Sequence, residues 1–146
     1  MKKKTAVSAC LIGINCKYSG GNNLSVKVIK YLEDKEYITV CPECRGGLSV
    51  PRMPCEIRVA DGVRRVFSSD GIEYTDEYYK GAEKELEAIR SFGAAECILK
   101  ENSPSCGVHR IYDGTFSSVI IPGSGIAAEM FMKAGICVLS DEDIPD

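Results

Sequence analysis

Three cysteines each follow a short apolar segment that is typical of a β-strand. They are Cys10 after residues 5–9, Cys41 after residues 37–40 and Cys106 after residues 95–99. If these segments are parallel strands of one open sheet, their carboxyl ends line a single crevice, which is where ligands bind in such folds. Three thiolates in one crevice are soft ligands, so the pattern predicts a metal or iron–sulfur centre with an open coordination position. An open position favours an enzyme over a structural zinc site.

The segments between these strands indicate how the cysteines are positioned. Apolar residues at helical spacing predict helices over about 24–33, 76–92 and 123–134. A short extended segment is expected near 115–121 and a last strand over 136–139, while Asp61-Gly62 predicts a β-hairpin and residues 43–54 an ordered loop. Strand and helix alternate, which favours a single α/β domain over residues 1–146. Its sheet is expected to be doubly wound, Rossmann-like, open and mostly parallel, with a small β-hairpin insertion.

Composition and charge exclude several classes of partner. The chain is 45% hydrophobic and 27% charged, as in ordinary globular proteins. Its net charge of −3, with no basic stripe beyond Lys2-Lys3-Lys4, argues against a stable nucleic-acid complex. The apolar residues after this basic start are too interrupted for a signal peptide, and no segment approaches the ~20 apolar residues of a membrane span. We therefore expect a cytoplasmic protein whose eight cysteines serve metal or catalytic chemistry rather than disulfides.

Several short motifs, in order along nearly the whole chain, resemble those of a bacterial family catalogued as a domain of unknown function. The motifs are Ser8-Ala-Cys-Leu-Ile-Gly13, Cys16-Lys-Tyr-Ser-Gly20, Cys41-Pro-Glu43, Gly46-Gly-Leu48, Pro51-Arg52 and Ser103-Pro-Ser-Cys-Gly107. This family includes the iron–sulfur thiouracil desulfidases. The resemblance is specific because three separated groups of motifs occur together.

The resemblance implies a cofactor, a site and a reaction. It implies that Cys10, Cys41 and Cys106 hold a 4Fe-4S cluster whose fourth iron takes the sulfur of a thiolated pyrimidine, and that Glu43 and Ser103 are the acid–base residues. The expected activity is a non-redox, hydrolytic exchange of C=S for C=O that releases the oxo-base and sulfide. A free thiolated base or nucleoside is the expected substrate, because relatives thought to act on transfer RNA carry a further domain that this chain has no room for.

The other cysteines leave alternatives open. Cys97 and Cys137 lie inside apolar strands and are expected to pack in the interior. Cys44 and Cys55 stand where the family commonly has apolar or small residues, so their roles, and that of Cys16, stay open.

A second function is compatible with the loop after the second strand. Cys41-Pro-Glu-Cys44 is a CxxC motif, so the alternative is a zinc- or thiol-based binding or redox-sensing module. A companion CxxC is missing, and Gly46-Gly47 follows where a redox motif would open a helix. Arg52 is expected to be a structural anchor and His109 a surface residue.

Overall fold

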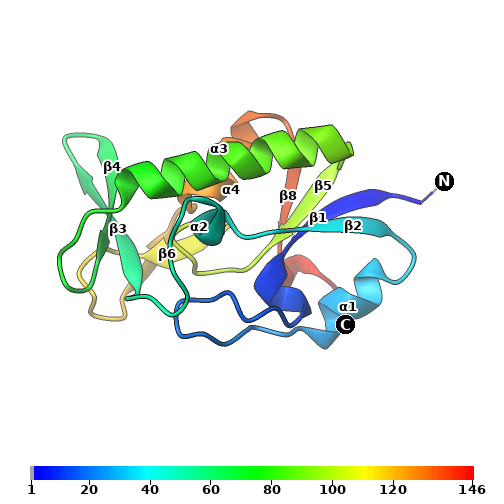
Figure 1. The fold of residues 1–146 in the computed structure, drawn as a ribbon, viewed down its shortest axis with the longest axis horizontal. Helices are drawn as coiled ribbons and strands as arrows, with labels where there is room; N and C mark the ends of the chain where they lie inside the picture. The colour runs from blue at the N-terminus through cyan, green and yellow to red at the C-terminus, as the bar shows by residue number, and fades with distance from the viewer. Residues whose placement is uncertain (1) are drawn as a thin grey trace.

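A four-stranded parallel sheet forms the centre of the protein in a computed structural model that describes residues 2–146. Its strands are β1 (Lys4–Ser8), β2 (Glu36–Val40), β5 (Glu96–Leu99) and β8 (Cys137–Ser140). They lie in the order β2-β1-β5-β8, and each neighbouring pair runs parallel. The carboxyl ends of β1, β2 and β5 therefore meet at one edge of the sheet (Figure 1).

Helical segments cover both faces of this sheet (Figure 1). They are the helices α1 (Val26–Leu32), α2 (Pro42–Arg45), α3 (Thr75–Phe92) and α4 (Ile126–Lys133), and the 3-10 helices η1 (Ala9–Ile12) and η2 (Asp141–Asp143). Side chains alternate along β1, so Ala6 packs in the core under α3 and α4 while Val7 packs with Leu11 and Val28 on the other face. The central strands β1 and β5 are buried on both faces over almost their whole length, whereas the edge strands β2 and β8 are mostly half-buried or exposed. The predicted doubly wound α/β sheet is confirmed.

Two antiparallel pairs lie beside the central sheet. The first consists of β3 (Cys55–Ala60) and β4 (Val63–Ser68), and the second of β6 (Arg110–Tyr112) and β7 (Ile120–Pro122). Asp61 and Gly62 connect β3 to β4 with φ angles of 53° and 76°. Positive φ at both positions is what a two-residue hairpin turn requires, so the predicted hairpin is confirmed. The pairing of β6 with β7 was not predicted, because each strand has only three residues.

The short helix α2 packs directly against α3 through two glycines. A Cβ on Gly81 would lie 1.8 Å from the carbonyl oxygen of Pro42, and one on Gly46 would lie 2.0 Å from that of Glu77. The backbones of α2 and α3 are therefore in direct contact at these glycines. Pro42 occupies the first helical position of α2. The prediction of a loop throughout residues 43–54 was wrong here, because four residues are too few to show helical spacing. The CxxC motif consequently does open a helix.

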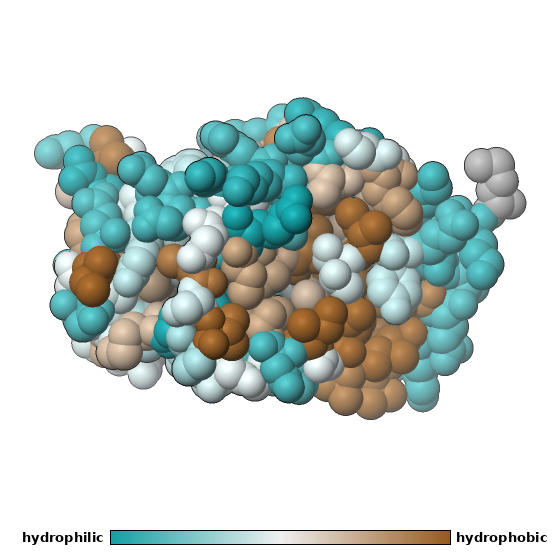
Figure 2. Space-filling view, in the orientation of Figure 1, coloured by the Kyte–Doolittle hydropathy of each residue, from teal (hydrophilic) through white to brown (hydrophobic). Residues whose placement is uncertain are grey.

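The long helix α3 has polar residues toward solvent and buried ones toward the sheet. Tyr78, Ala82, Glu85 and Ile89 are buried at helical spacing, and Gly93 ends the helix in the left-handed conformation. Figure 2 shows mostly hydrophilic surface along this helix and a more apolar area in the region of α1. Within residues 2–146, no helix combines the length and apolarity needed to cross a membrane.

Candidate active site and cluster pocket

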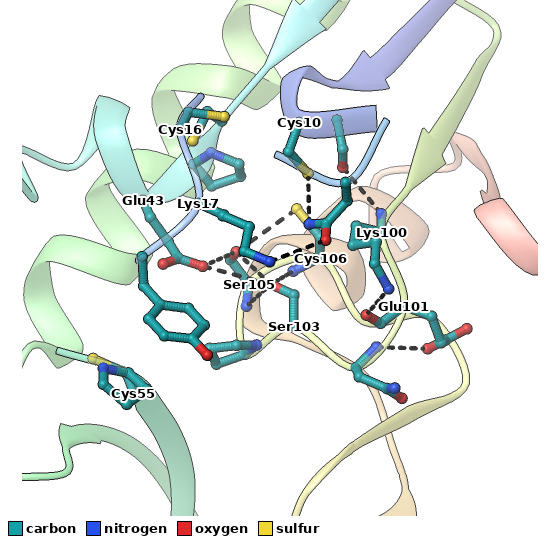
Figure 3. Close-up of a pocket in the computed structure, with 18 of the residues that line it drawn as sticks. Cys10, Cys16, Lys17, Glu43, Cys55, Lys100, Glu101, Ser103, Ser105 and Cys106 are labelled. Carbon is teal, nitrogen blue, oxygen red and sulfur yellow. Dashed lines mark hydrogen bonds between the residues drawn. The ribbon is translucent and has the colours of Figure 1, made fainter. Parts of the chain in front are cut away.

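The carboxyl ends of β1, β2 and β5 open into one pocket of about 500 Å³. The predicted site residues all line it: Cys10, Cys41, Glu43, Ser103 and Cys106. Figure 3 labels four of them, Cys10, Glu43, Ser103 and Cys106. Cys10 lies in η1 directly after β1, Cys41 directly follows β2, and Cys106 lies in the loop after β5. The fold thus brings together thiols that are far apart in the sequence, at the edge where the strand pattern placed them.

Hydrogen bonds fix two of these cysteines at their strand ends. The Asn23 backbone N–H donates to the carbonyl oxygen of Cys10 over 3.0 Å, and Asn23 Nδ2 donates to Cys10 Sγ over 3.4 Å. The Cys41 backbone N–H donates to Glu85 Oε2 over 2.7 Å. Glu85 projects from α3 and also pairs with Arg45 at 3.0 Å, so α3 holds the start of α2 in place.

The loop that carries Cys106 is held by the Ser103 side chain. Ser103 Oγ accepts the backbone N–H groups of Ser105 at 3.1 Å and Cys106 at 3.0 Å. Such local bonds from a serine hydroxyl stabilise a tight turn. Cys106 is buried, with its backbone fixed at the floor of the pocket. Ser103 therefore has a structural role in addition to its predicted catalytic one.

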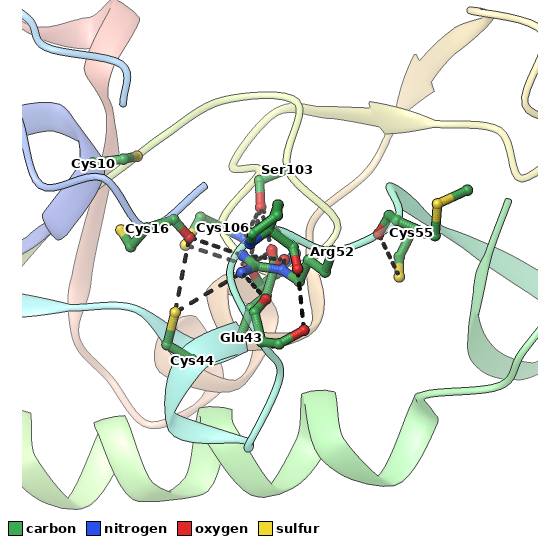
Figure 4. A network of polar contacts seen from close by, with 12 residues as sticks. Cys10, Cys16, Glu43, Cys44, Arg52, Cys55, Ser103 and Cys106 are labelled. Atoms are coloured by element: carbon green, nitrogen blue, oxygen red, sulfur yellow. Dashed lines mark hydrogen bonds and ion pairs between the residues drawn. The ribbon is translucent and has the colours of Figure 1, made fainter. Parts of the chain in front are cut away.

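Glu43 is the centre of a polar network at the side of the pocket (Figure 4). Arg52 Nη2 lies 2.9 Å from Glu43 Oε1, and the two side chains are only 8% and 13% exposed. The same guanidinium donates to the carbonyl oxygens of Cys16 and Ser49, each at 3.0 Å. Glu43 Oε2 accepts the hydroxyl of Ser105 at 2.7 Å. The carboxylate is thus oriented by a cation on one oxygen and a hydroxyl on the other.

The pocket disfavours the thiolate forms of Cys10, Cys41 and Cys106. Burial raises the pKa of the Cys106 thiol to about 12 and also raises that of Cys10. The pKa of Cys41 is raised by its hydrogen bond with the Cys16 thiol and by burial, whereas the same bond lowers the pKa of Cys16. Cys10 and Cys41 each raise the pKa of Cys106 further by charge repulsion. A metal centre that supplies positive charge would stabilise these thiolates together.

The donor set in the pocket fits an iron–sulfur cluster. Both oxygens of Glu43 already have partners, and His109 lies outside the pocket, where it bonds Asp143 at 2.9 Å. Glu101 also lines the pocket and its Oε2 has no hydrogen-bond partner among the described residues, but the soft donors there are the cysteine sulfur atoms, which suit iron–sulfur clusters. Over residues 2–146, no three His, Cys, Asp or Glu side chains converge as ligands of a single metal ion. The thiols instead surround a cavity, and a cluster of several iron and sulfur atoms requires such an arrangement.

The remaining cysteines have different environments. Cys97 is fully buried, as predicted, but Cys137 is exposed, so its interior placement was wrong. It lies on β8, the edge strand of the sheet, where its side chain faces solvent. Cys16 and Cys55 line the pocket, while Cys44 lies beside the Arg52 network and donates to the Cys16 carbonyl oxygen over 3.8 Å.

Two residues of the site, Ser105 and Asn23, were assigned no role from the sequence, and a third, Arg52, was expected to have only a structural role. Ser105 stands inside the motif that contains Ser103 and Cys106, so its hydroxyl was visible as a candidate. Arg52 is the anchor that was expected, but its partner is the Glu43 carboxylate. Asn23 gave no signal, because only the folded loop places its amide beside the sulfur of Cys10.

Comparisons with known proteins agree with this geometry. The model of the 2-thiouracil desulfurase family matches residues 5–143. The uncharacterized protein YbbK of Bacillus subtilis (strain 168) is 41% identical over 146 residues, which cover 96% of this chain and 97% of that protein. The solved structure of the 4Fe-4S-dependent thiouracil desulfidase TudS is 36% identical, with a TM-score of 0.89, and the match covers 99% of this chain and 94% of that one. The chain therefore belongs to the 2-thiouracil desulfurase family.

Proposed function

We propose that this protein is a desulfidase that removes the sulfur of a thiolated pyrimidine such as 2-thiouracil. The observation that carries this proposal is the convergence of Cys10, Cys41 and Cys106 on one pocket beside the anchored carboxylate of Glu43. Membership of the 2-thiouracil desulfurase family and similarity to the thiouracil desulfidase TudS support the same activity.

We assign Cys10, Cys41 and Cys106 as the ligands of a 4Fe-4S cluster. A cluster held by these three thiolates would supply a Lewis-acidic iron for the sulfur of the thiocarbonyl group, which would make the ring carbon more electrophilic. All eight cysteines are free, so no disulfide competes for these thiols. Free thiols also fit the reducing cytoplasm, the compartment that we expect for this protein.

Glu43 is positioned to accept a proton from the attacking water. Arg52 holds Oε1, so the other carboxylate oxygen is presented to the hydroxyl groups of the pocket. Ser105 Oγ lies 2.7 Å from Oε2, and Ser103 Oγ lies 3.0 Å from Ser105 Oγ and 3.5 Å from Oε2. These oxygens form a short path along which a proton moves between the carboxylate and the substrate.

The proposed reaction needs neither an oxidant nor a reductant. Water adds its oxygen to the ring carbon as the carbon–sulfur bond breaks, and the two protons of water leave with sulfur as hydrogen sulfide. The carbon keeps its oxidation state, so the exchange of C=S for C=O is hydrolytic. The residues of the chain supply only proton transfer and orientation in this scheme.

A small thiolated base or nucleoside is the substrate that this site fits best. A pocket of about 500 Å³ lies within the usual range of small-molecule sites. The net charge of −3 gives no electrostatic footprint for a nucleic-acid backbone.

The test is anaerobic reconstitution followed by metal and sulfide analysis and an assay with 2-thiouracil. We expect iron and sulfide in the purified protein and release of uracil and sulfide during turnover. Cys10→Ser, Cys41→Ser and Cys106→Ser should each lose most of the iron, whereas Cys137→Ser, which changes an exposed thiol outside the pocket, should keep it. Zinc in place of iron, or iron loss that follows Cys44→Ser instead, would support the rival CxxC module.

A further inference from the structure

One wall of the pocket comes from outside the central sheet. Cys55 and Glu56 of β3, together with Tyr112 and Phe116 of the β6–β7 segment, line the same cavity as the cluster cysteines. None of these side chains takes part in the proton path described above. Phe116 is half-buried and lines the pocket, so the core does not enclose it completely.

The structure holds Phe116 in a backbone conformation that is unfavourable for an aromatic residue. Its φ angle is 57°, in the left-handed region, where bulky side chains are rare. The Phe116 backbone N–H donates to Glu56 Oε1 over 3.2 Å, and the Gly114 N–H donates to the same oxygen over 3.0 Å. Glu56 is a buried carboxylate of the hairpin. A strained conformation persists where surrounding contacts fix it, and such positions cluster at functional sites.

A second residue of the hairpin fixes the ring itself. The guanidinium of Arg58 lies over the Phe116 ring, 5.9 Å from its centroid, and over the Phe67 ring at 5.0 Å. Arg58 Nε also donates to the carbonyl oxygen of Gly114 over 3.1 Å. The hairpin therefore determines both the backbone and the ring position of Phe116. A ring fixed in advance loses little conformational entropy when a ligand packs against it.

A thiolated pyrimidine offers two flat ring faces that an aromatic side chain can contact by stacking. Its ring is planar, with polar groups only at the edge, so the cysteines, Glu43 and Ser103 can address the edge but not the faces. We propose that Phe116 is the surface on which the pyrimidine ring stacks, and that it selects planar ring thiocarbonyls over acyclic ones such as thiourea. This assignment rests on the proposed function. It also gives the β3–β4 hairpin a role, because the hairpin positions the stacking residue.

The test compares Phe116→Leu, Phe116→Tyr and the matched control Phe67→Leu. Phe67 contacts the same guanidinium but does not line the pocket, so its replacement reports any effect that acts only through Arg58. Binding of uracil, which lacks the sulfur atom, is measured by equilibrium dialysis on cluster-loaded protein, together with KM and kcat for 2-thiouracil and for thiourea. Iron content and the thermal unfolding midpoint are recorded for each variant.

We expect Phe116→Leu to weaken uracil binding and raise KM for 2-thiouracil by about tenfold, the scale of a base–aromatic stack, with kcat and iron content little changed. Phe116→Tyr should restore binding, and Phe67→Leu should leave it near the wild-type value. Equal binding by Phe116→Leu and the wild type, or equal losses in Phe116→Leu and Phe67→Leu, would overturn the proposal. If the wild-type enzyme itself released no sulfide, the proposed function would fail instead, so the two failures are distinct.

Discussion

The replacement Glu43→Gln separates proton chemistry from cluster binding. It keeps the size of the side chain and removes the base. A general base commonly contributes 10² to 10⁴ in rate, so turnover of 2-thiouracil should fall by about 10²-fold or more. Iron content should stay at the wild-type level, because a carboxylate whose oxygens are occupied by Arg52 and Ser105 is not needed as a ligand.

The structural cost of this replacement follows from the same contacts. The amide oxygen still accepts from Arg52 at the position of Oε1, and the amide nitrogen faces Ser105, whose hydroxyl turns to accept it. Each hydrogen bond keeps a partner, but the buried guanidinium of Arg52 loses its counter-ion. Removing one charge of a buried ion pair costs about 3–5 kcal/mol, and the hydrogen bonds that the amide retains should limit the fall in the free energy of unfolding to roughly 2–3 kcal/mol. The variant therefore remains folded at room temperature, and its loss of activity is not caused by unfolding.

The assay uses anaerobically reconstituted protein, with iron determined per chain and sulfide release followed over time. Glu129→Gln is the matched control, because Glu129 of α4 pairs with Arg64 of β4 outside the pocket, and its replacement should leave turnover unchanged. Near-normal turnover by Glu43→Gln with a full cluster would refute the proton path. Loss of iron together with activity would show that Glu43 is a ligand or a structural residue.

Further expectations concern packing, acid stability and the two strand cysteines. Gly81→Ala should lower the free energy of unfolding in denaturant by about 1–3 kcal/mol and reduce iron loading, because its Cβ would lie 1.8 Å from the Pro42 carbonyl oxygen of α2. Gly21→Ala is the control, since a methyl group there has room. Burial alone would raise the pKa of Glu96, but hydrogen bonds from a lysine and two hydroxyl groups lower it. The ionised Glu96 carboxylate therefore stabilises the fold fully above the unfolded-state pKa of about 4.3, and this stabilisation is lost as the pH falls further. The difference in the free energy of unfolding between the wild type and Glu96→Gln should accordingly become smaller below about pH 4. Cys97→Ala should cost about 1 kcal/mol and Cys137→Ala less than about 0.5 kcal/mol, with iron content unchanged in both.

The sheet and the convergence of the site were predictable because strand-end position is a local pattern. Once the alternation of strands and helices indicates a parallel sheet, a cysteine that follows an apolar run is expected near the carboxyl edge of that sheet. The same reasoning failed for Cys137, since an apolar run does not reveal whether its strand is central or at an edge. Cys97 lies on central β5 and is buried, whereas Cys137 lies on edge strand β8 and is exposed.

The network around Glu43 could be predicted only in part, because its contacts join distant segments. Arg52 and Ser105 reach the carboxylate from loops that are separated by the whole β3–β4 hairpin and α3. The packing of α2 on α3 was also invisible, since the absence of a side chain at Gly46 and Gly81 has meaning only when the facing backbone is known. The residue types thus indicated that Glu43 takes part in the site. Only the tertiary structure shows that its Oε1 faces Arg52 and its Oε2 faces Ser105.

The pairing of β1 with β5 has a consequence for the maturation of this protein. Thr5 pairs with Glu96, so Cys10 and Cys106 become neighbours only after most of the chain has been synthesised and the sheet has formed. A cluster delivered to a nascent chain would find at most two of its thiols together. We therefore expect the apoprotein to fold first and to receive its cluster afterwards, with the hydrophobic core alone supporting the empty pocket. Chelation of iron should accordingly leave a folded, reloadable protein, unlike a zinc finger, which unfolds when its metal is removed.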